Sequence, residues 1–216
     1  MIDRRHARLL VEYLVLFYGV VGLFILAGSP GGPIPPLVVL AVAAWLMLRR
    51  DPTFEQANLL RAAAVPGQVR SIVALWGLAV VVSVVAIAVV APDRLFDLPR
   101  RMPLLWVAVV VLYPLVSVYP QELIYRAFLL HRYGPVFGGA DTRGAAAAGT
   151  AAFGFAHLMF GSVWSVLLTL IGGWLFARRY QRSRSLLAAA VEHALYGVLA
   201  FTVGLGDLFY HGATAR

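Results

Sequence analysis

The sequence contains no cysteine and no lysine, and only 13% of its 216 residues are charged. The absence of cysteine excludes a thiol nucleophile, a thiolate metal site and a disulfide bond. The charged fraction is about half the ~25% of ordinary globular domains. Hydrophobic residues make up 61% of the chain, and the mean hydropathy is +0.82. This composition excludes a disordered chain and an ordinary soluble enzyme, and it predicts a polytopic membrane protein.

All 18 basic residues are arginines, and the formal net charge is +8. In a soluble protein such an excess would suggest nucleic-acid binding. Here the arginines cluster at the edges of apolar runs, where they orient helices and meet anionic headgroups. We therefore expect the lipid bilayer, and no nucleic acid, as a partner. The predicted location is the bacterial inner (plasma) membrane, with the chain as an integral membrane protein.

Seven apolar runs approach the ~20 residues that a membrane-spanning helix needs. They lie at residues 9–28, 34–48, 71–91, 103–132, 144–160, 163–178 and 186–209. Arginine is concentrated in one alternate set of the connecting loops, which predicts a cytoplasmic N-terminus and an outside C-terminus. The expected fold is an all-α transmembrane bundle of about seven spans, with residues 1–216 forming one domain. The polar segment 51–68 is predicted to form an amphipathic helix at the membrane interface.

Ionisable side chains inside apolar runs cost about 2.5–3.5 kcal/mol each on insertion scales, so they indicate function. Glu122 and Arg126 stand four residues apart and can pair on one helix face. With a helical rise of ~1.5 Å per residue, Glu122, His157 and His193 lie roughly 15, 20 and 12 Å from the presumed cytoplasmic helix ends. A carboxylate and two imidazoles at one level can activate water and stabilise an oxyanion. A structural ion pair and hydrogen-bonding histidines are the non-catalytic interpretation of the same residues.

Three short motifs follow one another within residues 103–206. They are Gln121-Glu122-Leu-Ile-Tyr-Arg126, Phe153-Gly-Phe-Ala-His157 and His193-Ala-Leu-Tyr-Gly197. Their order and spacing resemble the CPBP family of intramembrane endopeptidases, the group of type II CAAX prenyl endopeptidases and bacteriocin-processing enzymes. That family shows E-E-x-x-x-R, F-x-x-x-H, and H-x-x-x-N or H-x-x-x-D.

The resemblance implies glutamic-type hydrolysis of a peptide bond in a membrane-associated protein or peptide. Glu122 and His157 would activate water, and Arg126 would orient the glutamate region. His193 and the amide of the third motif would stabilise the oxyanion. Supporting positions are Gln121, Phe153 and Tyr196.

Two positions depart from the family pattern. Gln121 replaces the first glutamate and cannot accept a proton in the same way, while the side chain of Glu122 points about 100° away from it on a helix. Gly197 replaces the asparagine or aspartate and has no side-chain donor. Loss of one oxyanion donor costs about 2.7–4 kcal/mol in other enzymes. Tyr196 or a backbone group would have to substitute.

Two alternatives to this interpretation stay open. We expect no cofactor, but one carboxylate and two histidines also match a facial metal triad, so a divalent metal such as zinc is the rival. The H-E-x-x-H signature of zinc proteases is absent. The non-enzymatic alternative is a membrane scaffold, an immunity protein or a small transporter that uses the same polar cluster.

Overall fold

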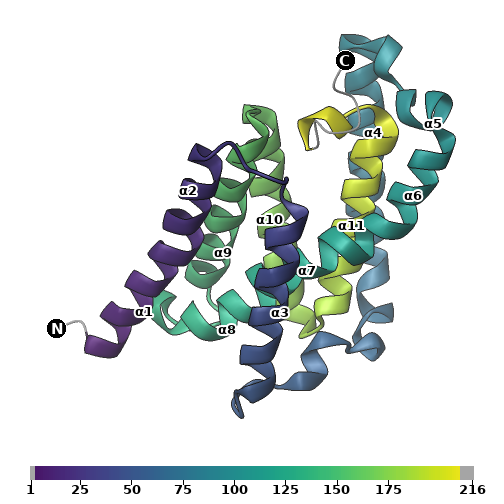
Figure 1. Ribbon diagram of the computed structural model, residues 1–216. Coiled ribbons are helices and arrows are strands. Elements are labelled where there is room, and N and C mark those ends of the chain that lie inside the picture. Colours follow the sequence, from purple (N-terminus) through teal and green to yellow (C-terminus); the bar gives the residue numbers. More distant parts are fainter. Residues whose placement is uncertain (1–2, 210–216) are drawn as a thin grey trace.

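The computed structural model describes residues 3–209, and every regular element in this part of the chain is helical, with no β-strand (Figure 1). The α-helices are α1 (Arg4–Leu14), α2 (Val21–Leu26), α3 (Ile34–Arg50), α4 (Pro66–Val90), α5 (Asp97–Arg101), α6 (Pro103–Tyr113), α7 (Tyr119–Glu122), α8 (Leu129–Tyr133), α9 (Arg143–Ala156), α10 (Val163–Ser183) and α11 (Leu186–Val203). Three π-helical segments are η1 (Val15–Val20), η5 (Pro114–Val118) and η6 (Leu123–Phe128). The 3₁₀ segments are η2 (Gln56–Leu59), η3 (Ala62–Ala64), η4 (Pro92–Arg94), η7 (Gly134–Phe137), η8 (His157–Phe160) and η9 (Gly206–Leu208).

Every predicted apolar run coincides with a helix, which confirms the all-helical class. Four helices in the described part of the chain are long and apolar enough to cross a membrane, at Arg4–Leu26, Pro66–Val90, Pro103–Phe137 and Leu186–Val203. The helices α3 and α9 are shorter, with 17 and 14 residues, and α10 ends in an arginine-rich stretch. The count of seven spans and the orientation stay predictions.

The predicted amphipathic helix over residues 51–68 is wrong. The segment instead forms a turn and the short 3₁₀ segments η2 and η3, and α4 begins at Pro66. Asp51 ends α3 and accepts a hydrogen bond from the backbone N–H of Thr53 at 2.9 Å, which stabilises the turn. Proline suits the first turn of a helix because its missing N–H has no helical partner there. Local turn chemistry therefore outweighs the amphipathic pattern.

The helix over Pro103–Phe137 is irregular where it carries the first motif. Pro114 and Pro120 have no backbone N–H to donate to the preceding turn. The turns at η5 and η6 widen to π-helix, and α7 is a short piece between them. Such π-helical segments occur frequently at functional sites. Glu122 is the last residue of α7 and stands directly before η6.

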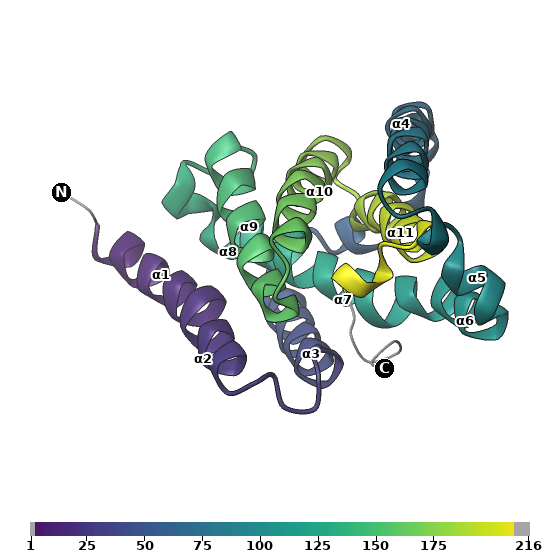
Figure 2. The ribbon, with the colours of Figure 1, turned by 90° about the horizontal axis from the view of Figure 1, so that it is seen from above.

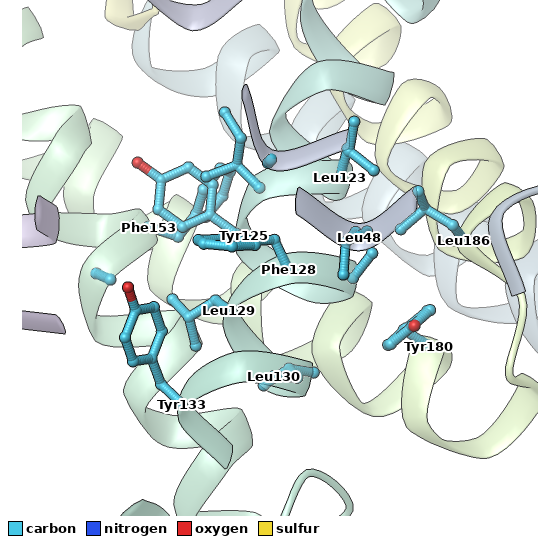
Figure 3. Close-up of a cluster of buried hydrophobic side chains, with 14 of the residues drawn as sticks. Leu48, Leu123, Tyr125, Phe128, Leu129, Leu130, Tyr133, Phe153, Tyr180 and Leu186 are labelled. Carbon is cyan, nitrogen blue, oxygen red and sulfur yellow. The ribbon is translucent and has the colours of Figure 1, made fainter. Parts of the chain in front are cut away.

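The apolar core lies where α1 and α3 meet the second half of this helix and α9. Figure 3 shows Tyr125, Phe128 and Leu129 of that helix with Leu48 of α3 and Phe153 of α9, all of which are buried. Two polar interactions hold α1 against α8 and α9. Arg132 pairs with Glu12 at 2.6 Å, and the Tyr13 hydroxyl donates to the Ala148 carbonyl at 3.0 Å. On the other side, α11 packs between α10 and α4 and also contacts α6 (Figure 2).

Candidate active site

Glu122 has no exposed surface, and its carboxylate contacts two members of the predicted polar cluster, Arg126 and His193. Its Oε1 lies 2.9 Å from Nδ1 of His193 on α11. Because a carboxylate accepts, Nδ1 of His193 carries the proton in this bond. Its Oε2 lies 3.2 Å from Nε of Arg126. The predicted ion pair on one helix face is present, and it is joined to a histidine 71 residues further along the chain.

The guanidinium of Arg126 is also completely buried. Its Nη2 donates to the carbonyl of Gly173 on α10 at 3.4 Å. Its Cζ lies 4.5 Å from the ring centre of Phe153 and 5.6 Å from that of Phe176. A desolvated cation over aromatic faces gains about 2 kcal/mol. Arg126 is therefore held by one carboxylate, one carbonyl and two rings, and it covers one oxygen of Glu122.

Phe153 connects the two histidines. Its ring centre lies 4.5 Å from that of His157 and 5.6 Å from that of His193, both in edge-to-face geometry. His193 also stacks on Phe176, with ring centres 4.5 Å apart. The histidine of the second motif and that of the third thus share one aromatic neighbour, which also lies under Arg126. The structure brings all three motifs into one cluster.

His157 is fixed by a backbone bond. Its Nδ1 lies 2.8 Å from the carbonyl oxygen of Phe153, one turn earlier on α9. A carbonyl oxygen only accepts, so Nδ1 carries the proton. In the neutral ring the lone pair is then on Nε2, at the opposite side of the imidazole. The ring is half-buried and lines a cavity, so His157, and not the buried His193, is the histidine of the cluster that a water or a substrate can reach.

The cavity has a volume of about 1380 Å³ and reaches from α2 and α3 to α6 and η9. Its walls are mostly apolar, and its uncharged polar lining side chains include His157, Gln121, Ser117 and Tyr113. The side-chain amide of Gln121 donates to Ser117 Oγ at 2.7 Å. Glu122 lies behind this wall because it has no exposed surface. The residue that faces the cavity is therefore the glutamine that replaces the first family glutamate.

The sequence reasoning missed Tyr113, the last residue of α6. Tyr113, Ser117 and Gln121 are spaced by four residues, which places them on one side of the helix, and all three line the cavity. This spacing was the signal that could have identified Tyr113. Tyr196, the predicted supporting residue, has its ring centre 5.9 Å from that of Phe176. Tyr113, not Tyr196, occupies the space where a side chain at position 197 would lie.

The side chains do not fit the divalent-metal alternative. Within residues 3–209 no three His, Asp or Glu side chains are grouped so that they could hold a metal ion. One oxygen of Glu122 is bonded to His193, and the other faces the guanidinium of Arg126. A cation bound at Glu122 would have to displace these partners. These residues therefore do not favour a metal-assisted reaction, and the expectation of no cofactor stays a prediction.

Comparison with protein families gives one match in the region of the motifs. Residues 102–199 match the family described as type II CAAX prenyl endopeptidase Rce1-like, which is a family of proteases. Comparison with curated proteins and with solved structures finds no match. The resemblance drawn from the three motifs is confirmed. The helices that can span a membrane and this family together support an integral membrane protein.

Proposed function

With residues 102–199 assigned to the Rce1-like family of type II CAAX prenyl endopeptidases, we propose that the chain is an intramembrane endopeptidase whose activity depends on Glu122. Its substrate is a membrane-associated protein or peptide. The observation that carries the proposal is the histidine pair. His157 has its Nε2 free of the backbone bond at the cavity, and His193 is bonded to a buried carboxylate behind it.

The water is activated at the cavity wall. The Nε2 of His157 accepts a proton from a water molecule that the side-chain carbonyl of Gln121 helps to orient. The oxygen of this water attacks the carbonyl carbon of the scissile peptide bond. From the sequence, Glu122 was expected to polarise the water itself. Because Glu122 has no exposed surface, His157 performs this step instead.

Glu122 acts through His193. The carboxylate accepts the Nδ1–H bond and fixes the ring, as the acid of a catalytic triad does. When His193 is doubly protonated, its Nε2 donates to the oxyanion and Glu122 balances the positive charge. Arg126 holds the second oxygen of Glu122. Glu122 and Arg126 are therefore positioning residues in this scheme.

The tetrahedral intermediate then collapses. Its C–N bond breaks, and the proton held on His157 Nε2 passes to the leaving amine. The oxygen of the water remains in the new carboxylate. One water is consumed, one carboxylic acid and one amine are formed, and no oxidant, reductant or metal is needed.

A second candidate is a non-catalytic membrane protein that uses the cavity only for binding. The observation that favours it is the separation of Glu122 from the cavity, with Gln121 in its place at the wall. A hydrogen bond from His193 engages one oxygen of Glu122, the ion pair with Arg126 engages the other, and one nitrogen of each histidine is also bonded. In this case the cluster would only stabilise the bundle.

Cleavage in a reconstituted membrane separates the two candidates. The purified chain is placed in liposomes with membrane-anchored test peptides, with and without a prenyl group, and the products are identified by mass spectrometry. We expect new peptide termini that increase with time and with enzyme concentration. A folded chain that cleaves no peptide, but co-purifies with the peptides after the liposomes are dissolved in detergent, would refute the proposal and favour the binding protein.

A further inference from the structure

Gly197 stands one turn after His193 on α11, where the family pattern has asparagine or aspartate. A Cβ atom on Gly197 would lie 2.6 Å from Cζ of Tyr113, and closer still to its Cε1 and hydroxyl oxygen. No side chain can occupy this position while Tyr113 stays in place. The volume of the missing side chain is therefore filled by the phenol of Tyr113, which comes from another helix.

The ring of Tyr113 is held firmly in this position. Its centre lies 6.4 Å from that of His193 and 5.6 Å from that of Phe201, one turn after Gly197, both in edge-to-face geometry. The Trp106 indole N–H donates to Thr202 Oγ1 at 2.9 Å and fixes α6 against α11. These contacts hold the hydroxyl of Tyr113 beside position 197 of α11, one helical turn after His193.

The same residue belongs to the cavity wall. Tyr113 lines the same cavity as Gln121 and His157. Within residues 3–209, no hydrogen bond joins the Tyr113 hydroxyl to another side chain or to a carbonyl. A phenol O–H can donate one hydrogen bond, as the side-chain amide of asparagine does. Phenols are among the donors that proteins use to stabilise oxyanions.

We propose that the Tyr113 hydroxyl donates the hydrogen bond to the oxyanion that a side chain at position 197 provides in the family pattern. This inference rests on the proposed peptidase function. It explains why a glycine at position 197 is compatible with activity, since any larger residue would displace Tyr113. The donor has moved from α11 to α6 while its location relative to His193 is kept.

The test measures kcat and KM for cleavage of one membrane-anchored peptide. Tyr113→Phe removes only the hydroxyl, and we expect kcat to fall roughly 100- to 1000-fold with little change in KM. The matched control is Tyr119→Phe, which removes a hydroxyl that bonds to the Leu59 carbonyl at 3.2 Å. The control should keep the kcat of the wild type. Thermal unfolding of each variant shows whether it is folded.

A swap of the donor gives an independent readout. Tyr113→Ala opens the space beside Gly197, and the double variant Tyr113→Ala/Gly197→Asn returns a donor to the family position. We expect the double variant to exceed Tyr113→Ala in kcat by about tenfold or more, since one such donor contributes 100- to 1000-fold.

The outcomes separate this inference from the proposed function. If the wild type cleaves and Tyr113→Phe has the same kcat, the donor role is refuted and the peptidase function stands. A double variant no more active than Tyr113→Ala would refute the donor role as well. A wild type that cleaves nothing would refute the peptidase function and, with it, the role of Tyr113.

Discussion

Replacement of Glu122 by glutamine keeps the shape of the side chain but leaves Arg126 without its carboxylate. Arg126 has no exposed surface, so water cannot replace the lost carboxylate as its partner. Its remaining partners would be the Gly173 carbonyl at 3.4 Å and the ring faces of Phe153 and Phe176. Removing one partner of a buried ion pair costs about 3–5 kcal/mol. We therefore expect Glu122→Gln to lower Tm by roughly 6–20 °C.

Unfolding in detergent micelles, followed by circular dichroism against temperature and denaturant, measures this effect. A double variant, Glu122→Leu/Arg126→Met, removes both charges and should recover most of the lost stability, because an apolar pair of similar volume often replaces a buried ion pair without loss. The control is Asp141→Asn at the exposed pair with Arg184, whose side chains are about half exposed. Its free energy of unfolding should change by less than about 1 kcal/mol.

Two results would refute this reasoning. One is a Glu122→Gln variant whose free energy of unfolding stays within about 1 kcal/mol of the wild type. A buried guanidinium without its carboxylate partner should destabilise the folded protein by more than this. The other is a double variant as unstable as the single one. Either result would mean that Arg126 does not depend on Glu122 in the folded protein.

Three further predictions concern the cavity wall, the metal alternative and the surface. Gln121→Glu returns the family carboxylate to the cavity wall, and we expect kcat in the peptide assay to rise about tenfold, because a positioned base contributes 10²–10⁴-fold; an unchanged or lower kcat would contradict the placement of Gln121. Exhaustive chelation should leave kcat unchanged because His193 and Arg126 hold both oxygens of Glu122, whereas a loss that added zinc reverses would support the metal alternative. At the surface, hydrogen bonds from Thr53 and His131 hold the pKa of Asp51 at about 2, below its ordinary value of 3.8. Since the folded pKa is the lower one, this stabilisation is present above about pH 4 and is lost as the pH falls toward 2. The Tm difference between Asp51→Asn and the wild type should shrink over that interval, and a constant difference would contradict this.

The helical class and the grouping of the motifs followed from the sequence because both depend on regular spacing. The long apolar runs predict helices, and the spacing of four between Glu122 and Arg126 predicts their pairing. The depth of each histidine in its run predicts that His193 and Glu122 meet near one level, and they are bonded in the structure. The 100° between adjacent helical side chains agrees with Gln121 at the cavity and Glu122 behind it.

The remaining features could not be predicted from the sequence, because residue spacing along one helix carries no information about which side chains of other segments pack against it. Nothing in the third motif indicates that the space beside Gly197 is filled from α6, since Tyr113 lies 84 residues earlier in the chain. The turn after α3 depends on the side chain of Asp51, which an amphipathic pattern ignores. The widened turns on either side of α7 are likewise not indicated by the long apolar run over residues 103–132.

The measurement that tests the central claim most directly is kcat of the purified chain and of two histidine variants in liposomes. His157→Gln removes the base at the cavity, while His131→Gln removes a histidine on α8 that lies 2.9 Å from Asp51, away from the motif cluster. We predict a fall in kcat of about 10²–10⁴-fold for His157→Gln and the wild-type value for His131→Gln. Equal kcat in the wild type and His157→Gln would contradict hydrolysis at this cavity.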